Sequence, residues 1–103
     1  MIKITATRNN GKIVNLTVKG HANSAPKGED LVCAAVSSVL VGGCNALKNH
    51  NCFAIKLDSG DASITEISHA YEHDYEVLET MLIQFKTIEE TSKKFLQIIE
   101  KGN

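Results

Sequence analysis

Apolar and polar residues alternate on both sides of a single turn near the start of this chain, and this pattern restricts the fold that the first residues can adopt. Apolar side chains recur at every second position in residues 2–6 and again in residues 14–18. A period of two is typical of half-buried β-strands. Between them lies Asn9-Asn10-Gly11, a strong turn sequence. Residues 1–19 therefore predict a β-hairpin.

A loop and then a long apolar segment follow the hairpin. Residues 20–29 are rich in Asn, Ser, Pro and Gly, which favour a loop. Asp30 is a good N-cap, and the residues from Leu31 to about Lys48 predict a helix that is apolar on nearly every side. Such a helix is expected to be central and buried. Gly42 and Gly43 each cost it roughly 1 kcal/mol relative to alanine, so we expect them to allow close approach to another backbone, in a sheet or in a partner chain.

The second half of the chain also passes from strands to a helix. Residues 53–57 alternate as a third strand, residues 59–61 form a turn, and residues 62–67 predict a fourth strand. Apolar residues at helical spacing predict an amphipathic helix from about residue 72 to residue 91. Residues 95–100 fit a helix or a strand equally well. The order ββαββα, with one undecided last element, indicates an α+β fold with a small antiparallel or mixed sheet and two main helices.

Length and composition restrict the possible partners. The 103 residues suit one domain, spanning residues 1–103. A formal net charge of −1 and an aromatic content of 5% without Trp argue against direct nucleic-acid binding. The apolar stretch Leu31–Val41 is too short to span a bilayer, and the first residues predict a strand rather than a secretory signal. The odd number of cysteines, three, favours reduced thiols. We expect a cytoplasmic protein with no membrane partner.

A histidine and a cysteine lie on either side of the predicted loop. Cys33 would be the third helical residue after Asp30, where the backbone N–H groups lack helical acceptors and the helix dipole favours a thiolate. His21 follows Gly20 and could accept the thiol proton if the loop folds back over the helix start. Amides of the same helical turn could stabilise an oxyanion. The pattern allows a nucleophilic pair, and we hypothesise that the loop closes fully only when substrate binds.

Each of these residues also has a simpler interpretation. A free cysteine such as Cys33 is most often a small buried hydrophobic residue. Asp30 fits a helix cap better than the third member of a triad that orients the histidine. Ser37, one turn after Cys33, either bonds near the sulfur or bonds back to a helix carbonyl. Cys44 and Cys52 are interpreted as packing residues.

A metal site is the rival interpretation of the thiols and histidines. The three cysteines lack the paired short spacing of structural zinc sites. His69 and His73 are four residues apart and close to Glu66, Glu72 and Asp74, so on one helical face they could bind a divalent ion. A solvated helix start, where acidic residues are favourable, explains the same residues and is preferred.

Two motifs resemble the signature of a known family. Residues 20–22 (Gly-His-Ala) and residues 28–37 (Gly-Glu-Asp-Leu-Val-Cys-Ala-Ala-Val-Ser) together look like the signature of the ribosomal-processing cysteine protease family, Prp. The resemblance extends along nearly the whole chain and includes the hairpin, the turn at residues 58–61 and the second long helix. Two departures are visible: Leu31 stands where isoleucine is usual, and the Tyr-Pro that often opens the last strand is missing.

The resemblance implies a bacterial cysteine endopeptidase that removes the N-terminal extension of a large-subunit ribosomal protein, number twenty-seven. It implies that His21 is the catalytic histidine and Cys33 the nucleophile, with Gly20, Asp30 and Ser37 in supporting roles. It also implies an α+β fold, a final strand, a homodimer, and no metal or organic cofactor.

Two other functions stay open at this stage. A non-catalytic ribosome-assembly or peptide-binding module could keep the same fold, and a thioester or other acyl transferase could use the same Cys–His pair. Rapid alkylation of Cys33 would favour an enzyme over a binding module, and a panel of acyl substrates would separate acyl transfer from peptide hydrolysis.

Overall fold

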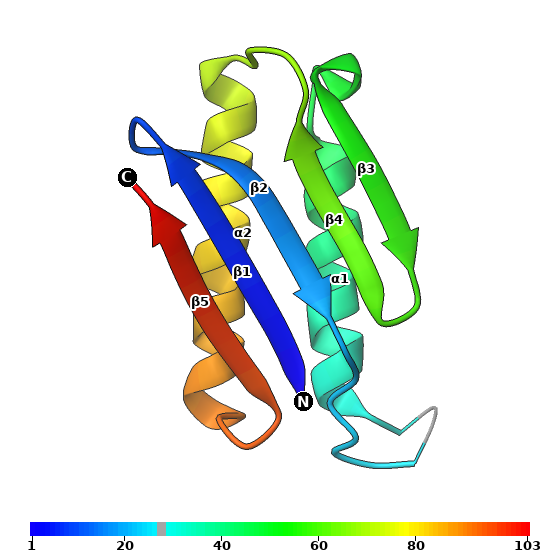
Figure 1. Ribbon diagram of the computed structural model, residues 1–103. Coiled ribbons are helices and arrows are strands. Elements are labelled where there is room, and N and C mark those ends of the chain that lie inside the picture. The colour runs from blue at the N-terminus through cyan, green and yellow to red at the C-terminus, as the bar shows by residue number, and fades with distance from the viewer. Residues whose placement is uncertain (27–28) are drawn as a thin grey trace.

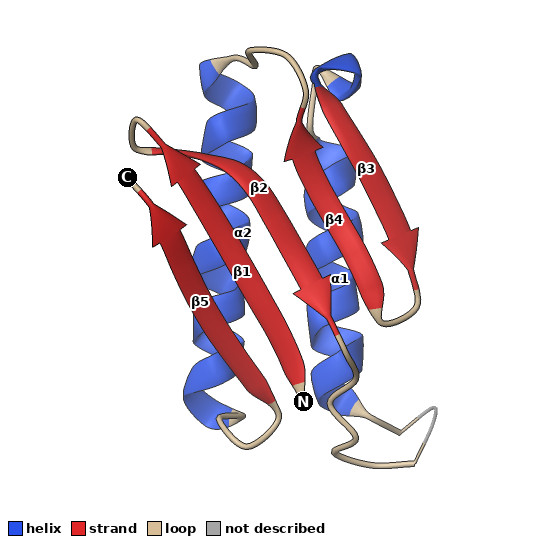
Figure 2. Ribbon diagram, viewed as in Figure 1, coloured by secondary structure: helices blue, strands red, loops and turns tan. Residues whose placement is uncertain are grey.

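A five-stranded sheet carries two long helices on one of its faces in the computed structural model of the chain (Figure 1). The structure describes residues 1–26 and 29–103. The elements, coloured by type in Figure 2, are β1 (Ile2–Asn9), β2 (Lys12–Lys19), α1 (Leu31–Ala46), the 3₁₀ turn η1 (His50–Cys52), β3 (Phe53–Asp58), β4 (Asp61–Glu66), α2 (Glu72–Thr91) and β5 (Leu96–Gly102). This is the predicted α+β order, ββαββαβ.

The predicted hairpin forms the middle of the sheet. The strand order is β3-β4-β2-β1-β5, and β1 pairs antiparallel with β2. Asn10 and Gly11 in the turn have φ of 53° and 78°. Positive φ at both central residues is the backbone conformation of a type I′ hairpin turn, which explains the Asn-Gly sequence. The prediction for residues 1–19 is confirmed.

The last element is a strand, as the family resemblance implies. β5 pairs parallel with β1, from Ile2 opposite Leu96 to Arg8 opposite Gly102. The remaining sheet pairs are antiparallel, so the sheet is mixed. The residues of β5 alone did not distinguish strand from helix, because the partner that makes it a strand lies at the opposite end of the chain.

The core lies between the helices and the face of the sheet that they cover. Ile4, Leu16 and Phe85 are each 0% exposed within it. On the opposite face, Thr5 and Thr17 are cross-strand neighbours with polar side chains. This division explains the period of two in the strands, because one side of each strand meets the helices and the other side meets water. No helix in residues 1–26 or 29–103 is long and apolar enough to cross a membrane.

Helix α1 lies on the surface of this two-layer structure, so the expectation of a central buried helix is wrong. Only Val36, Leu40 and Cys44 of α1 are buried, and Val41 is 47% exposed. A helix that packs on one sheet face can bury only one side, and the small residues Ala, Gly and Ser occupy much of the other. The helix ends at Ala46, two residues before the predicted end.

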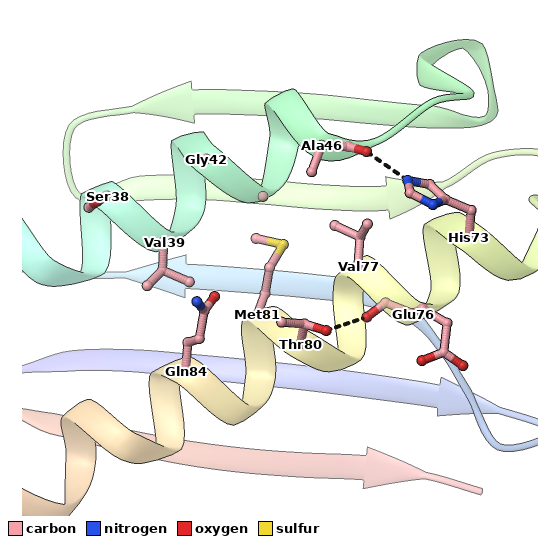
Figure 3. Close-up of a pocket in the computed structure, with 11 residues that line it drawn as sticks. Ser38, Val39, Gly42, Ala46, His73, Glu76, Val77, Thr80, Met81 and Gln84 are labelled. Carbon is pink, nitrogen blue, oxygen red and sulfur yellow. Dashed lines mark hydrogen bonds between the residues drawn. The ribbon is translucent and has the colours of Figure 1, made fainter.

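The two helical glycines have different surroundings. A Cβ on Gly43 would lie 2.2 Å from Sδ of Met81. Gly43 therefore allows the close approach of a side chain of α2, whereas we expected the close approach of a backbone. A Cβ on Gly42 would have no described atom within 4 Å. Both line a hollow of about 380 Å³ between α1 and α2, on the side of the helices away from the sheet (Figure 3).

Candidate active site

Three segments meet at one end of the sheet: the residues after β2, the start of α1, and the β3–β4 turn (Figure 1). Two hollows of about 520 Å³ and 170 Å³ lie there. They share four lining residues, which are His21, Cys33, Ser37 and Ser59. The structure therefore brings together the histidine, the cysteine and the serine that the sequence singles out.

A hydrogen bond to sulfur joins the histidine segment to the helix start. The backbone N–H of Ala22, the residue after His21, donates to Sγ of Cys33 at 3.4 Å. Ala22 is buried and Cys33 is half-buried. An N–H donor directed at sulfur stabilises a thiolate more than a thiol, because charge strengthens the hydrogen bond. The segment after β2 therefore folds back onto the start of α1, as a Cys–His pair requires.

Asp30 caps α1 and also holds the loop. Its Oδ1 accepts from the Cys33 N–H at 3.0 Å and from Oγ of Ser24 at 2.5 Å, and its Oδ2 accepts from the Ser24 N–H at 3.0 Å. The hydrogen bond from the Cys33 N–H, followed by those from Ser24, holds the pKa of the Asp30 carboxyl well below its usual range. Among the described residues these hydrogen bonds do not extend to His21, so the helix-capping interpretation is the one that the structure supports.

The cap changes which amides could stabilise an oxyanion. The Cys33 N–H is bonded to the Asp30 side chain, and the Ala34 N–H donates to the Asp30 carbonyl at 3.0 Å. Of the first four amides of α1, those of Leu31 and Val32 are left without a recorded acceptor among the described residues. The amides of Leu31 and Val32 are therefore the ones in this turn that fit the expected oxyanion donors.

The β3–β4 turn is a wall of the site that local sequence patterns did not indicate. Ser59 lines both hollows, and the Gly60 carbonyl accepts from the Gly20 N–H at 2.9 Å. The turn reaches β2 because β4 pairs with β2, with Asp61 opposite Lys19. The sequence predicts the turn at residues 59–61, but its place beside His21 and Cys33 follows from strand pairing that local patterns do not contain.

Gly20 has a steric reason to be glycine. Its φ is +92°, and a Cβ there would lie 2.4 Å from the carbonyl oxygen of Met1. A side chain would therefore meet both an unfavourable backbone conformation and a collision with the start of β1. The residue before His21 is thus held in a fixed place.

Of the motif residues, Gly28 lies outside the described residues, as does the loop residue Lys27.

Ion pairs of Asp61 link the β3–β4 turn to the neighbouring strands β2 and β3. Asp61 pairs with Lys19 in β2 and with Lys56 in β3, the latter at 2.6 Å. The hydrogen bond from Lys19, and then that from Lys56, lower the pKa of Asp61 to about 2. Asp61 is therefore a carboxylate at neutral pH and links three strands beside the site.

The histidines and the aspartate of the alternative metal site each contact a different partner group. His73 Nε2 lies 3.0 Å from the Ala46 carbonyl oxygen (Figure 3), and His69 Nδ1 lies 3.4 Å from the Tyr75 hydroxyl. Asp74 is fully buried and accepts from the backbone N–H groups of Lys48 and Asn49 at 2.8 and 3.1 Å. Within the described part of the chain, no group of three or more His, Cys, Asp or Glu side chains could hold a metal ion.

The two remaining cysteines are packing residues, as interpreted from the sequence. Cys44 in α1 and Cys52 in η1 are both buried, and all three cysteines of the sequence are free thiols. Burial raises the pKa of the Cys44 thiol, which keeps it protonated and unreactive. Cys33 is the cysteine that lines the hollows.

A half-buried cysteine at a helix start, sharing a hollow with a histidine, is the arrangement of a thiol-dependent hydrolase. Residues 1–97 match the family model described as cysteine protease Prp. The chain belongs to this family and is a cysteine protease.

Relatives and solved structures agree with this assignment. The chain is 34% identical over 107 residues to the ribosomal processing cysteine protease Prp of Bacillus subtilis, covering 95% of this chain and 96% of that one. It is similar, with a TM-score of 0.88 and 30% identity, to the ribosomal processing protease Prp of Staphylococcus aureus in complex with a covalently linked product peptide, covering 98% and 100% of the two chains. The same Staphylococcus aureus protease in complex with a substrate peptide gives a TM-score of 0.82 at 30% identity, with the same coverage.

Proposed function

We propose that this protease removes the N-terminal extension of a large-subunit ribosomal protein, number twenty-seven, with Cys33 as the nucleophile and His21 as the base. The observation that carries the proposal is that His21 and Cys33 line the same hollows while the Ala22 N–H donates to Sγ of Cys33. The ribosomal substrate is supported by the activity after which the relatives in Bacillus subtilis and Staphylococcus aureus are named.

The chemistry proceeds through an acyl-enzyme. His21 takes the proton of the Cys33 thiol, and the thiolate attacks the scissile carbonyl carbon to form a tetrahedral intermediate. The C–N bond breaks as His21 gives its proton to the leaving amine, and the new N-terminus departs. Water then attacks the thioester carbonyl carbon while His21 takes a proton from it. The C–S bond breaks, the Cys33 sulfur regains a proton from His21, and the N-terminal extension leaves with a free carboxyl group. The Leu31 and Val32 amides are the first candidates to hold the oxyanion.

The supporting residues shape the site around this pair. Asp30 caps the helix that carries Cys33 and holds Ser24, so it keeps the loop on the helix start. Gly20 fixes the chain before His21, and Ser37 lines the hollows one turn after Cys33. The peptide would lie extended in the larger hollow. Closure of the segment after β2 over the correct peptide would complete the site and give specificity.

The direct test is mass spectrometry of the ribosomal precursor after incubation with the purified protein. The wild-type protein is expected to remove the N-terminal extension, while Cys33→Ala and His21→Ala abolish cleavage. Cys44→Ala and His69→Ala are matched controls, because they remove a thiol and an imidazole outside the site and should keep turnover. Full cleavage by either site variant would remove that residue from the mechanism.

We also propose that the protease is a cytoplasmic homodimer. Three free thiols suit a reducing compartment. The hollow between α1 and α2 is the candidate dimer surface, because Gly42 leaves open space there beside Val39 and Val77 (Figure 3). Sedimentation velocity tests this: the wild-type protein should sediment as a dimer, and Gly42→Arg should sediment as a monomer. A wild-type monomer at micromolar concentration would contradict the proposal.

A further inference from the structure

The imidazole of His21 rests against the bare α-carbon of Gly60 in the β3–β4 turn. A Cβ built on Gly60 would lie 2.5 Å from Nε2 of His21 and 3.0 Å from Cε1. Such distances are well inside van der Waals contact, so any side chain at residue 60 would collide with the His21 ring, which lines the same hollows as Cys33. Nε2 is one of the two ring nitrogens that can carry a proton in general-base catalysis.

The turn is tied to its neighbours by a backbone hydrogen bond and two ion pairs, whereas the His21 side chain is exposed and moves more easily. The Gly60 carbonyl accepts from the Gly20 N–H at 2.9 Å, and Asp61 is paired with both Lys19 and Lys56. The backbone before His21 is fixed on its other side, because Gly20 lies against the carbonyl of Met1. A collision at residue 60 is therefore relieved most easily by rotation of the His21 side chain away from its position.

We propose that Gly60 is a positioning residue for the protease reaction. Its lack of a side chain sets the place of the His21 ring in the hollows that His21 shares with Cys33. The inference rests on the proposed role of His21 as the base and adds a residue from a different strand pair to the site. It also gives a second reason, beyond the turn conformation, for glycine at this position.

Gly11 offers a matched control for the backbone. Gly60 has φ of +70° and Gly11 has φ of +78°, so alanine at either position suffers a similar conformational penalty. A Cβ on Gly11 would have no described atom within 4 Å. Gly11 lies in the β1–β2 turn, at the opposite end of the sheet from the β3–β4 turn (Figure 1). Gly11→Ala therefore reports the cost of the backbone alone.

The first experiment compares cleavage of a peptide that spans the ribosomal cleavage site. Gly60→Ala should lower kcat by about ten- to a hundredfold with little change in KM, because a ring displaced by about 1 Å loses catalytic geometry. Gly11→Ala should keep kcat within about twofold of the wild type while losing similar thermal stability. Gly60→Asn is a second variant, since asparagine tolerates positive φ but still carries a Cβ. It should fold better than Gly60→Ala and be equally slow.

The second experiment asks whether Gly60 acts through His21. Alkylation of Cys33 by iodoacetamide at about pH 6 reports thiolate formed with the help of the imidazole. Gly60→Ala should slow this alkylation, and in a His21→Ala background the same substitution should have no further effect. A Gly60→Ala enzyme as fast as Gly11→Ala, or an equal slowing with and without His21, would overturn the proposal.

The outcomes also separate this inference from the proposed function. If His21→Ala retains full turnover, the role of His21 as base fails, whatever Gly60→Ala does. If His21→Ala is inactive and Gly60→Ala and Gly60→Asn both match Gly11→Ala, only the inference about Gly60 fails.

Discussion

At the scale of single residues, one carboxylate organises the start of the site. Asp30 accepts from the Cys33 N–H and from two groups of Ser24, so it links the start of the helix that carries Cys33 to the loop residue Ser24. A helix cap needs an acceptor at this position but does not need a charge, whereas a triad member that stabilises an imidazolium does. Substitutions at Asp30 can therefore separate the two roles.

Asp30→Asn is expected to keep turnover within a few-fold of the wild type, because asparagine is as good an N-cap as aspartate. Asp30→Ala should lower kcat/KM by about tenfold or more and lower the melting temperature, since the loop and the helix start lose their shared acceptor. Peptide cleavage and thermal unfolding measure both effects. If Asp30→Asn were as inactive as Asp30→Ala but melted at the wild-type temperature, the charge itself would be required and a triad role would be restored.

The same carboxylate makes a pH-dependent contribution to stability. Its pKa in the folded protein is depressed, chiefly by the hydrogen bond from the Cys33 N–H. The contribution is therefore complete above the ordinary carboxyl pKa of about 3.9 and is lost as the pH falls below that value toward the folded-state pKa. The stability difference between the wild type and Asp30→Asn should shrink accordingly in acid, as followed by urea unfolding at stepped pH.

At the scale of elements, two adjacent glycines of α1, Gly42 and Gly43, contribute differently to its packing against α2. Gly43→Ala should destabilise the fold by about 1–3 kcal/mol, because its Cβ would overlap the Met81 side chain. Gly42→Ala should stabilise the folded monomer by about 0.5–1 kcal/mol, because its Cβ enters open space and alanine is the better helix former. Urea unfolding of the two variants, at protein concentrations too low for dimer formation, measures the difference. Equal effects of the two substitutions would contradict the described packing.

Local periodicity predicted the individual strands and helices well, and non-local contacts account for what it missed. The bounds of α2 and the hairpin follow from spacing and from Asn10-Gly11, which act within a few residues. The burial of α1 and the strand β5 depend on the second layer and on β1, which local patterns do not contain. At the candidate site, two nearby motifs predicted that His21 and Cys33 lie together, and both line the same hollows. The contact of Gly60 with His21 was not predicted, because Gly60 reaches His21 only through the pairing of β4 with β2.

At the scale of the whole molecule, the fold leaves one of the three thiols accessible and buries the other two. Cys33 lines the open hollows at the end of the sheet, while Cys44 and Cys52 are each 6% exposed in the core. Burial in the core also raises the pKa of the Cys44 thiol. Reaction of Cys44 and Cys52 with an alkylating agent therefore requires opening of the packed structure, and reaction of Cys33 does not.

Iodoacetamide is accordingly expected to modify Cys33 in the native protein well before the other two thiols. Labelling of Cys44 and Cys52 should appear only as urea approaches the unfolding midpoint, and all three should react at similar rates once the chain is unfolded. Peptide mapping by mass spectrometry measures each site. Native labelling of Cys44 or Cys52 as fast as that of Cys33 would contradict the packing of the core.

In the proposed mechanism, the sulfur of Cys33 becomes covalently bonded to the carbonyl carbon of the cleaved peptide. Acid quenching during turnover of the ribosomal precursor, followed by intact-mass analysis and peptide mapping, tests it directly. We expect an added mass equal to that of the released N-terminal extension less one water, held as a thioester on Cys33 and missing from Cys33→Ala. Cleavage of the precursor at the wild-type rate by Cys33→Ala, with no adduct at any stage, would contradict it.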